Sequence, residues 1–322
     1  MEYIKLGKSN LNVSRICLGC MGFGDGSGSQ NWAVNQEQTN QIIKRALDLG
    51  INFFDTANCY GNGSSEVFLG NALKKYAKRE NVIIATKVYY NEGKLSKEAI
   101  LKEIDKSLER LQTNYIDLYI IHRFDYDTPI AETMEALHSL VVSKKVRYIG
   151  ASAMYAYQFA KMQDLAREKG YIEFISMQNH YNLLYREEER EMIKLLLEEG
   201  VSSTPYSPLA GGRLARININ ETNRGRLDNF AKFKYDSTIK SDYPIILREK
   251  EISEKYNVSQ AQVALAWLLS KKVVASIIIG ATKVKHIEDA VASLSLKLTA
   301  DDINYLEQLY VPHKVVGALD KN

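Results

Sequence analysis

The feature that most constrains the fold is a regular alternation of short runs rich in β-branched residues with longer segments of helical periodicity. Eight of these runs are predicted to be strands, at residues 15–20, 51–55, 82–87, 115–121, 146–151, 173–178, 201–206 and 274–279. Between them, apolar residues recur at helical spacing, as on one face of residues 97–111. This repetition of strand, helix and strand predicts a parallel sheet covered by helices.

Two architectures satisfy this repeat: an open doubly wound sheet and a closed eight-stranded β/α barrel. The count of eight and the length of 322 residues favour the barrel, since such barrels typically run to about 250 residues plus insertions. We therefore predict a single domain over residues 1–322, an eight-stranded parallel β/α (TIM) barrel with an N-terminal β-hairpin at 3–13 and a tail helix near 300–309. The polar segment 210–245 is predicted to be a long loop after the seventh strand.

Composition and charge argue against several kinds of partner. The formal net charge is only +3, and there is no long Lys/Arg block, so neither nucleic acid nor an anionic membrane is the expected partner. No apolar run approaches the roughly 20 residues that span a bilayer, and the N-terminus lacks the apolar core of a signal peptide, so we expect a cytoplasmic protein. The acidic run REEERE at 186–191 is predicted to be the solvated start of a helix.

The three cysteines, Cys17, Cys20 and Cys59, are few and odd in number, which fits a reducing compartment. Cys17 and Cys20 have the CxxC spacing of a redox pair or of half a zinc site. They lie in the apolar run 16–21, and no second Cys/His pair at ligand spacing follows. This context favours buried, inert thiols, and no metal site is predicted.

Polar residues stand at the ends of most of the predicted strands. In a β/α barrel the catalytic groups lie at the carboxyl ends of the strands. Taken singly, an Asp at such a position could cap the next helix and a Lys could reach solvent. The barrel would instead bring these ends to one face, together with the nearby phenol of Tyr60. The residues at or just after the eight ends are Gly22, Asp55, Lys87, His122, Ser152, Gln178, Tyr206 and Gly280.

An acid, an amine, an imidazole and a phenol at one face suggest a site for proton transfer. A free tyrosine, with a pKa of about 10, is a poor proton donor to a carbonyl oxygen at neutral pH. The ammonium of Lys87 would favour the phenolate and so lower the pKa of Tyr60, while Asp55 would keep the ammonium charged. His122 would donate a second hydrogen bond to the same oxygen. Because this constellation supplies no electrons, a nicotinamide cofactor is its natural complement.

Seven stretches, in order along the chain, read FFDTANCYG, IIATK, YIIHRFD, VRYIGASAM, MQNHYN, YSPLAGGRL and IIIGATKVKHIED. With this order and spacing, the sequence resembles the aldo/keto reductase superfamily over nearly its whole length. MQNHYNLLYREEERE and the ending YVPHKVVG are similar to its bacterial and fungal branch rather than to the animal aldose reductases. The resemblance implies that Tyr60 is the general acid, that Lys87 and Asp55 tune its pKa, and that His122 orients the substrate.

The same resemblance implies a site for NADP(H). It implies that two polar residues bind the nicotinamide carboxamide and that the nicotinamide ring stacks on an aromatic residue. A loop would bind the pyrophosphate, and the start of a helix near residue 284 would bind the 2′-phosphate, because the helix dipole favours an anion there. For this reason NADP(H) is predicted over NAD(H). The implied cofactor-binding residues are Gly22, Phe23, Ser152, Gln178, Tyr206, Ser207, Pro208, Leu209, Gly211, Arg213, Gly280, Thr282, Lys283, His286 and Asp289.

Three positions depart from the family pattern. Ala153 follows Ser152 where many relatives have Asn, so that one hydrogen bond to the carboxamide would be missing. Phe124 replaces a common Trp, and its side chain would alter the shape of the substrate mouth. His286 stands where many relatives have Arg or Gln.

Two functions remain open from the sequence. The first is an NADPH-dependent oxidoreductase that reduces an aldehyde or ketone to an alcohol, a reaction that the same site could run in reverse. The alternative is an NADP(H)-binding regulatory or sensor subunit with slow turnover, as in the potassium-channel β subunits. The presence of all four catalytic residue types favours the enzyme. The expected partner is a small carbonyl compound, and the sequence does not determine its identity or the oligomeric state.

Overall fold

The computed structural model describes residues 1–26, 32–218 and 228–311. In these ranges eight parallel strands form one sheet, in the order β10-β3-β4-β5-β6-β7-β8-β9. Each predicted run overlaps one of these strands, although β9 is only two residues long. The strands are β3 (Ile16–Gly19), β4 (Phe53–Asp55), β5 (Ile83–Val88), β6 (Ile116–Ile121), β7 (Val146–Ser152), β8 (Phe174–Gln178), β9 (Ser202–Ser203) and β10 (Ile277–Gly280).

Hydrogen bonds between the segments that contain β9 and β10, the last and first strands of this order, close the sheet into a barrel. The backbone N–H of Ser203 donates to the carbonyl of Val273 at 2.8 Å, and the N–H of Ala275 donates to Ser203 at 3.0 Å. Further along, the N–H of Ile278 donates to the carbonyl of Pro205 at 3.1 Å. The prediction of a closed parallel barrel, rather than an open doubly wound sheet, is therefore confirmed.

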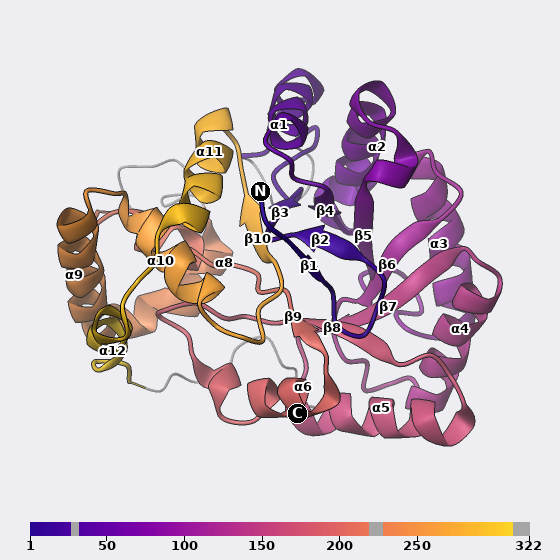
Figure 1. Ribbon diagram of the computed structural model, residues 1–322. Coiled ribbons are helices and arrows are strands. Elements are labelled where there is room, and N and C mark those ends of the chain that lie inside the picture. Colours follow the sequence, from indigo (N-terminus) through magenta and orange to yellow (C-terminus); the bar gives the residue numbers. More distant parts are fainter. Residues whose placement is uncertain (27–31, 219–227, 312–322) are drawn as a thin grey trace.

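An N-terminal hairpin covers the amino-terminal end of the barrel. Its strands β1 (Tyr3–Lys5) and β2 (Asn12–Ser14) pair antiparallel, as predicted for residues 3–13, and Figure 1 shows them lying across the barrel strands. Three buried side chains of the hairpin region, Leu6, Leu11 and Val13, join the apolar residues inside the barrel. With this end filled by apolar side chains, a polar site is left to the carboxyl ends of the strands.

Helices surround the barrel and bury a second, larger apolar core between themselves and the strands (Figure 1). Gly170 and Gly200 end two of them in the left-handed conformation, as helix-terminating glycines do. Along the described ranges, no helix has both the length and the apolar composition that crossing a membrane would require. The helices are α1 (Gln36–Asp48), α2 (Ser64–Tyr76), α3 (Lys97–Leu111), α4 (Ile130–Val142), α5 (Ala156–Lys169), α6 (Met192–Glu199), α8 (Asn229–Tyr235), α9 (Ile239–Tyr256), α10 (Gln260–Leu269), α11 (Val284–Ala292) and α12 (Ala300–Glu307).

The segment 210–245 is not the long loop that was predicted. It begins with a 3₁₀ segment at Ala210–Ala215, and it contains α8 and the first turns of α9; residues 219–227 lie outside the described part. α8 has only seven residues, too few for a clear periodic signal, and Pro244 lies inside α9, where a proline usually argues against a helix. The predicted tail helix is confirmed as α12, and it packs on α9 through Lys255, whose Nζ lies 2.6 Å from Oδ1 of Asp302.

Candidate active site

The alternation of side chains along the strands explains why an acid ends a core strand. Residues two apart on a strand face the same way, and Phe53, Ile83 and Ala85 belong to the apolar cluster inside the barrel. Asp55 and Lys87 therefore project into the barrel above those apolar residues. Apolar side chains fill the barrel from its amino-terminal end, and the inward-facing layer at the carboxyl ends of the strands is polar.

Lys87 is at the centre of this polar layer and is fully buried. Its Nζ donates hydrogen bonds to Oδ1 of Asp55 at 2.6 Å, to the carbonyl of Thr56 at 2.7 Å and to the phenol oxygen of Tyr60 at 3.3 Å. The other carboxylate oxygen of Asp55 accepts from Nε2 of Gln178 at 2.8 Å. Burial lowers the pKa of Lys87, but the charges of Asp55 and Tyr60 and the hydrogen bonds to both together outweigh that effect and leave the pKa above its ordinary value. The lysine is therefore a fully hydrogen-bonded ammonium.

Tyr60 lies in the 3₁₀ segment Tyr60–Gly63, directly after β4. Burial raises the pKa of Tyr60 to about 12, and the positive charge of Lys87 acts against this rise. The expectation that Lys87 would bring the pKa of Tyr60 below its ordinary value is therefore wrong in this structure, because desolvation of the phenolate outweighs the attraction of the ammonium. Tyr60 keeps its proton at neutral pH, as a proton donor must.

His122 follows β6 and faces the Tyr60 ring edge to face, with ring centroids 5.8 Å apart. Burial, followed by the charges of Lys87 and Arg123, lowers the pKa of His122 well below its ordinary value, so the imidazole is neutral. Its Nδ1 lies 3.8 Å from Sγ of Cys59, and burial raises the pKa of that thiol to about 11, which keeps it as S–H. If the thiol donates to Nδ1, the ring proton lies on Nε2, where it can serve a second acceptor.

The two residues that are predicted to bind the carboxamide are connected to this site by hydrogen bonds. The hydroxyl of Ser152 donates to the backbone carbonyl of Gln178 at 2.7 Å, and the side-chain amide of Gln178 donates to Asp55. Asp55, Tyr60, Lys87, His122, Ser152 and Gln178 are thus linked by contacts into one connected cluster at the carboxyl end of the barrel.

Tyr206 and the loop that follows it lie at the same end. The Tyr206 ring stacks on that of His180, with centroids 5.3 Å apart and planes 12° apart. After it, Ser207, Ala210 and Gly211 all have positive φ angles, so the backbone turns sharply past Pro208 and Leu209. A Cβ on Gly211 would lie 2.8 Å from Cβ of Ala231, so a glycine is required there.

Arg213 does not extend toward solvent from this loop. Its side chain is buried, and its Nη2 lies 2.5 Å from Oδ1 of Asp236. Its guanidinium also stacks over the ring of Tyr235, 5.1 Å from the centroid. An anion at the loop would have to compete with Asp236 for this arginine.

Residues predicted to hold the adenosine phosphate gather at the end of β10 and the start of α11. Gly280 is exposed. Thr282 lies beside Gly22, since a Cβ added to Gly22 would be 3.6 Å from the methyl group of Thr282. Lys283 is the N-cap residue of α11, and within the described part of the chain its side chain makes no capping hydrogen bond. The first-turn N–H groups of α11 therefore suit an anion. His286 is exposed in this first turn, and Asp289 lies further along the same helix.

Phe23, which is predicted to bind the cofactor, lies in the apolar core. Its side chain is fully buried in the larger apolar core, and its backbone bridges to Val34. Any contact between Phe23 and a cofactor would therefore come from its backbone rather than from its ring.

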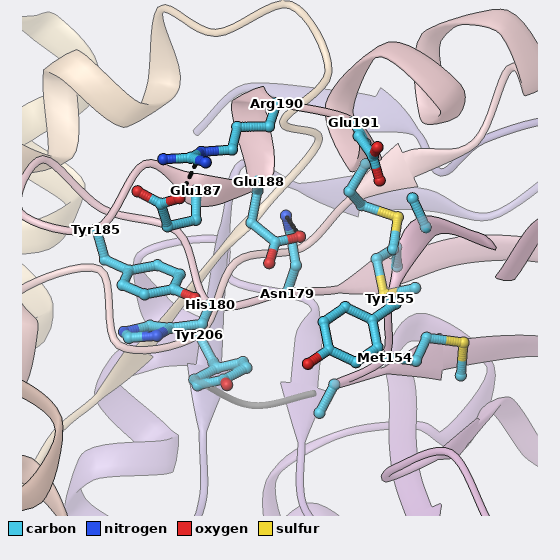
Figure 2. A pocket seen from close by; sticks show the side chains of 14 residues that line it. Met154, Tyr155, Asn179, His180, Tyr185, Glu187, Glu188, Arg190, Glu191 and Tyr206 are labelled. Atoms are coloured by element: carbon cyan, nitrogen blue, oxygen red, sulfur yellow. Dashed lines mark hydrogen bonds and ion pairs between the residues drawn. The ribbon is translucent and has the colours of Figure 1, made fainter. Parts of the chain in front are cut away.

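A cavity of about 160 Å³ lies beside Tyr206, on the side of β7 and β8. Figure 2 shows Glu188 turned toward Asn179, whose Nδ2 donates to it at 3.3 Å, while Arg190 pairs with Glu187. Burial raises the pKa of Glu188 to about 7. The prediction of a solvated helix start at 186–191 is therefore wrong for Glu187 and Glu188, which the fold turns inward.

Sequence reasoning also missed Lys234, which lies on α8 within the segment taken for a loop. Its side chain is buried, and its Nζ is 4.5 Å from the centre of the Tyr206 ring. A lysine in a polar segment carries no signal that distinguishes it from a surface lysine, so only the packing of α8 against the barrel reveals it.

Comparison with known proteins agrees with this geometry. Residues 15–311 match the model of the aldo/keto reductase family. The chain is 42% identical over 344 residues to the versiconal hemiacetal acetate reductase of Aspergillus parasiticus, covering 98% of each chain. It is 43% identical over 347 residues to an aldo-keto reductase of Fusarium vanettenii, covering 98% of this chain and 93% of that one. A protein of Schizosaccharomyces pombe that carries the name aryl-alcohol dehydrogenase is 40% identical over 346 residues, covering 98% and 97%.

These fungal relatives are similar along almost their entire length, and the fold, the family match and the linked polar cluster agree with one another. The chain belongs to the aldo/keto reductase family.

Proposed function

We propose that this member of the aldo/keto reductase family is an NADPH-dependent enzyme that reduces an aldehyde or ketone to an alcohol, reversibly, with Tyr60 as the proton donor. The observation that carries the proposal is the bridge made by Lys87, whose ammonium contacts both Asp55 and the phenol oxygen of Tyr60 inside the barrel. The family and the names of the relatives support carbonyl reduction in general.

The residues of this chain account for the proton half of the reaction. A bound reduced nicotinamide would supply a hydride to the carbonyl carbon. Tyr60 gives its proton to the carbonyl oxygen, and the ammonium of Lys87, 3.3 Å away, stabilises the phenolate that remains. Asp55 keeps that ammonium charged and in place. Neutral His122 donates a hydrogen bond from Nε2 to the same carbonyl oxygen, which also positions the substrate.

The residues present fit a nicotinamide dinucleotide phosphate. Ser152 and Gln178 offer polar groups for the carboxamide, and Tyr206 offers an aromatic surface beside them. The start of α11, with Lys283 and Thr282, offers backbone N–H groups, an ammonium and a hydroxyl for the 2′-phosphate. This donor set supports NADPH over NADH.

Aromatic side chains near the site support an aryl carbonyl compound as the substrate. The Tyr90 ring lies 5.1 Å from that of His122, and the rings of Phe124 and Tyr126 lie 5.0 Å apart. Two relatives are named for a versiconal hemiacetal acetate and for aryl alcohols. An aromatic aldehyde would find edge-to-face partners at this mouth.

The test is a fluorescence titration of the purified protein with NADPH and NADH, followed by single-turnover oxidation of bound NADPH with a panel of aromatic and aliphatic aldehydes. We expect tighter binding of NADPH than of NADH, and rapid oxidation with at least one aromatic aldehyde. Tight binding without oxidation across the panel would contradict the enzyme and favour a sensor of the cofactor. Equal affinity for the two cofactors would contradict the assignment of the 2′-phosphate site.

A further inference from the structure

Lys234 is a buried ammonium that pairs with no carboxylate in the described part of the chain. The residue lies on α8 and is only 6% exposed, and its Nζ makes no hydrogen bond with any described residue. Nζ lies 4.5 Å from the ring centroids of both Tyr206 and Phe230. The two aromatic rings hold the side chain in place, but neither carries a charge that would balance the ammonium.

Asp228 compensates this charge only in part. It caps α8, where it accepts a hydrogen bond from a backbone N–H of the first turn at 2.9 Å. Burial, followed by the positive charge of Arg123, lowers the pKa of Lys234 to about 7, and the charge of Asp228 acts against this shift. At pH 6 Lys234 is therefore charged. Unlike Lys87, which contacts Asp55 directly, it lacks a bonded counter-ion among the described residues.

One of the two rings beside Lys234, that of Tyr206, is the ring on which we expect the nicotinamide to stack. The nicotinamide of NADP⁺ is a positively charged pyridinium, whereas that of NADPH is neutral. A ring stacked on Tyr206 would lie within roughly 10 Å of Nζ of Lys234, whichever face of the tyrosine it takes. Two like charges at this separation repel each other, and burial weakens the screening by salt. The oxidised cofactor would meet this repulsion, and the reduced cofactor would not.

We propose that Lys234 discriminates against the oxidised cofactor: its ammonium weakens the binding of NADP⁺ relative to NADPH and so favours carbonyl reduction over alcohol oxidation. The inference rests on the proposed function, because it adds a residue to the cofactor site described there. The phosphates, riboses and adenine are the same in both forms of the cofactor, so their contributions cancel in the ratio of the two dissociation constants. This ratio therefore reports the charge near the nicotinamide.

The test is calorimetric titration of the purified protein with NADPH and with NADP⁺ at pH 6, where Lys234 is charged. Lys234→Met removes the charge and keeps an unbranched side chain. It should lower the ratio of the Kd for NADP⁺ to the Kd for NADPH by about threefold to tenfold. Lys234→Arg keeps the charge and should retain the wild-type ratio. A change in packing alone would alter both dissociation constants alike and leave the ratio unchanged.

The matched control is Lys240→Met, the same loss of charge at an exposed position on α9, which should give the wild-type ratio. Circular dichroism and urea unfolding show whether each variant is folded, and Lys234→Gln replaces Lys234→Met if the latter does not fold. A ratio that loss of the charge leaves unchanged would overturn the proposal. So would an equal fall in Lys234→Met and Lys234→Arg, because the charge would then not be the cause.

The same titrations separate failure of this inference from failure of the proposed function. If both forms of the cofactor bind but no carbonyl compound is reduced, the proposed enzyme fails, and the ratio still decides the role of Lys234. If both forms bind with the same ratio in the wild-type protein and in Lys234→Met, this inference fails alone. If neither form binds to the wild-type protein, the nicotinamide site is refuted and the inference with it.

Discussion

The ammonium of Lys87 lies 3.3 Å from the phenol oxygen of Tyr60 and 4.8 Å from the centre of its ring, inside the barrel. Tyr60 has a raised pKa in spite of this contact, because burial outweighs the charge. The ammonium therefore matters less for the resting phenol than for the phenolate formed once the proton has left. A group placed in this way stabilises the charge that develops during the reaction.

Replacing Lys87 by Met should lower kcat for carbonyl reduction by about 10²–10⁴-fold, the usual contribution of general acid catalysis. It should also destabilise the fold by about 3 kcal/mol, since Asp55 would be left as an unpaired buried charge. The double variant Lys87→Met/Asp55→Asn should regain most of that stability without regaining turnover. Urea unfolding and steady-state kinetics measure the two effects separately, and near-normal turnover in either variant would refute the role of Lys87.

Tyr60→Phe removes the transferable proton while keeping the ring that faces His122. We expect turnover to fall by about 10²–10⁴-fold, with NADPH affinity within a few-fold of the wild-type value. Fluorescence titration gives the affinity, and single-turnover oxidation gives the rate. A variant that binds NADPH normally and still reduces aldehydes at the wild-type rate would show that another group, or water, delivers the proton.

The contact between Cys59 and Nδ1 of His122, at 3.8 Å, predicts that the thiol selects the ring tautomer. Cys59→Ala should lower kcat several-fold and shift the ¹⁵N resonances of His122 toward a mixture of tautomers. Cys59→Ser retains a donor and should restore both properties. Cys20→Ala, which alters a buried thiol outside the described catalytic contacts, is the control. Unchanged ¹⁵N resonances in Cys59→Ala would refute this role.

Glu188 predicts a dependence of stability on pH. Burial raises its pKa from 4.5 to about 7. Between these two pH values Glu188 is therefore protonated in the folded protein but ionised in the unfolded chain. Stability is therefore lost as the pH rises through this range. Glu188→Gln, which stays neutral, should become more stable than wild type by roughly 2 kcal/mol at pH 8, with a smaller gain at pH 5.

Urea unfolding at the two pH values measures this difference. Glu191→Gln is the control, since Glu191 is exposed at the rim of the same cavity, and its effect on stability should be small at both pH values. An equal gain for Glu188→Gln at pH 5 and pH 8 would mean that the side chain does not titrate in this window.

The sequence by itself determined the barrel and the core of the candidate site. Strand positions follow from local patterns of β-branched residues, and a parallel barrel brings the carboxyl ends of its strands to one face whatever the details of packing. Asp55, Lys87, His122, Ser152 and Gln178 could therefore be placed together from their positions alone. Tyr60 follows, because it comes five residues after a strand end.

Tertiary structure alone decided the properties that depend on desolvation. The pKa of Tyr60 rises rather than falls because residues from distant segments exclude water from the phenol. Glu187 and Lys234 are buried because a 3₁₀ turn and α8 fold inward, whereas in the sequence they resemble surface charges. Side-chain periodicity is a local property that a sequence displays directly, but burial is a sum over contacts between segments far apart in the chain, and it appears only once the chain has folded.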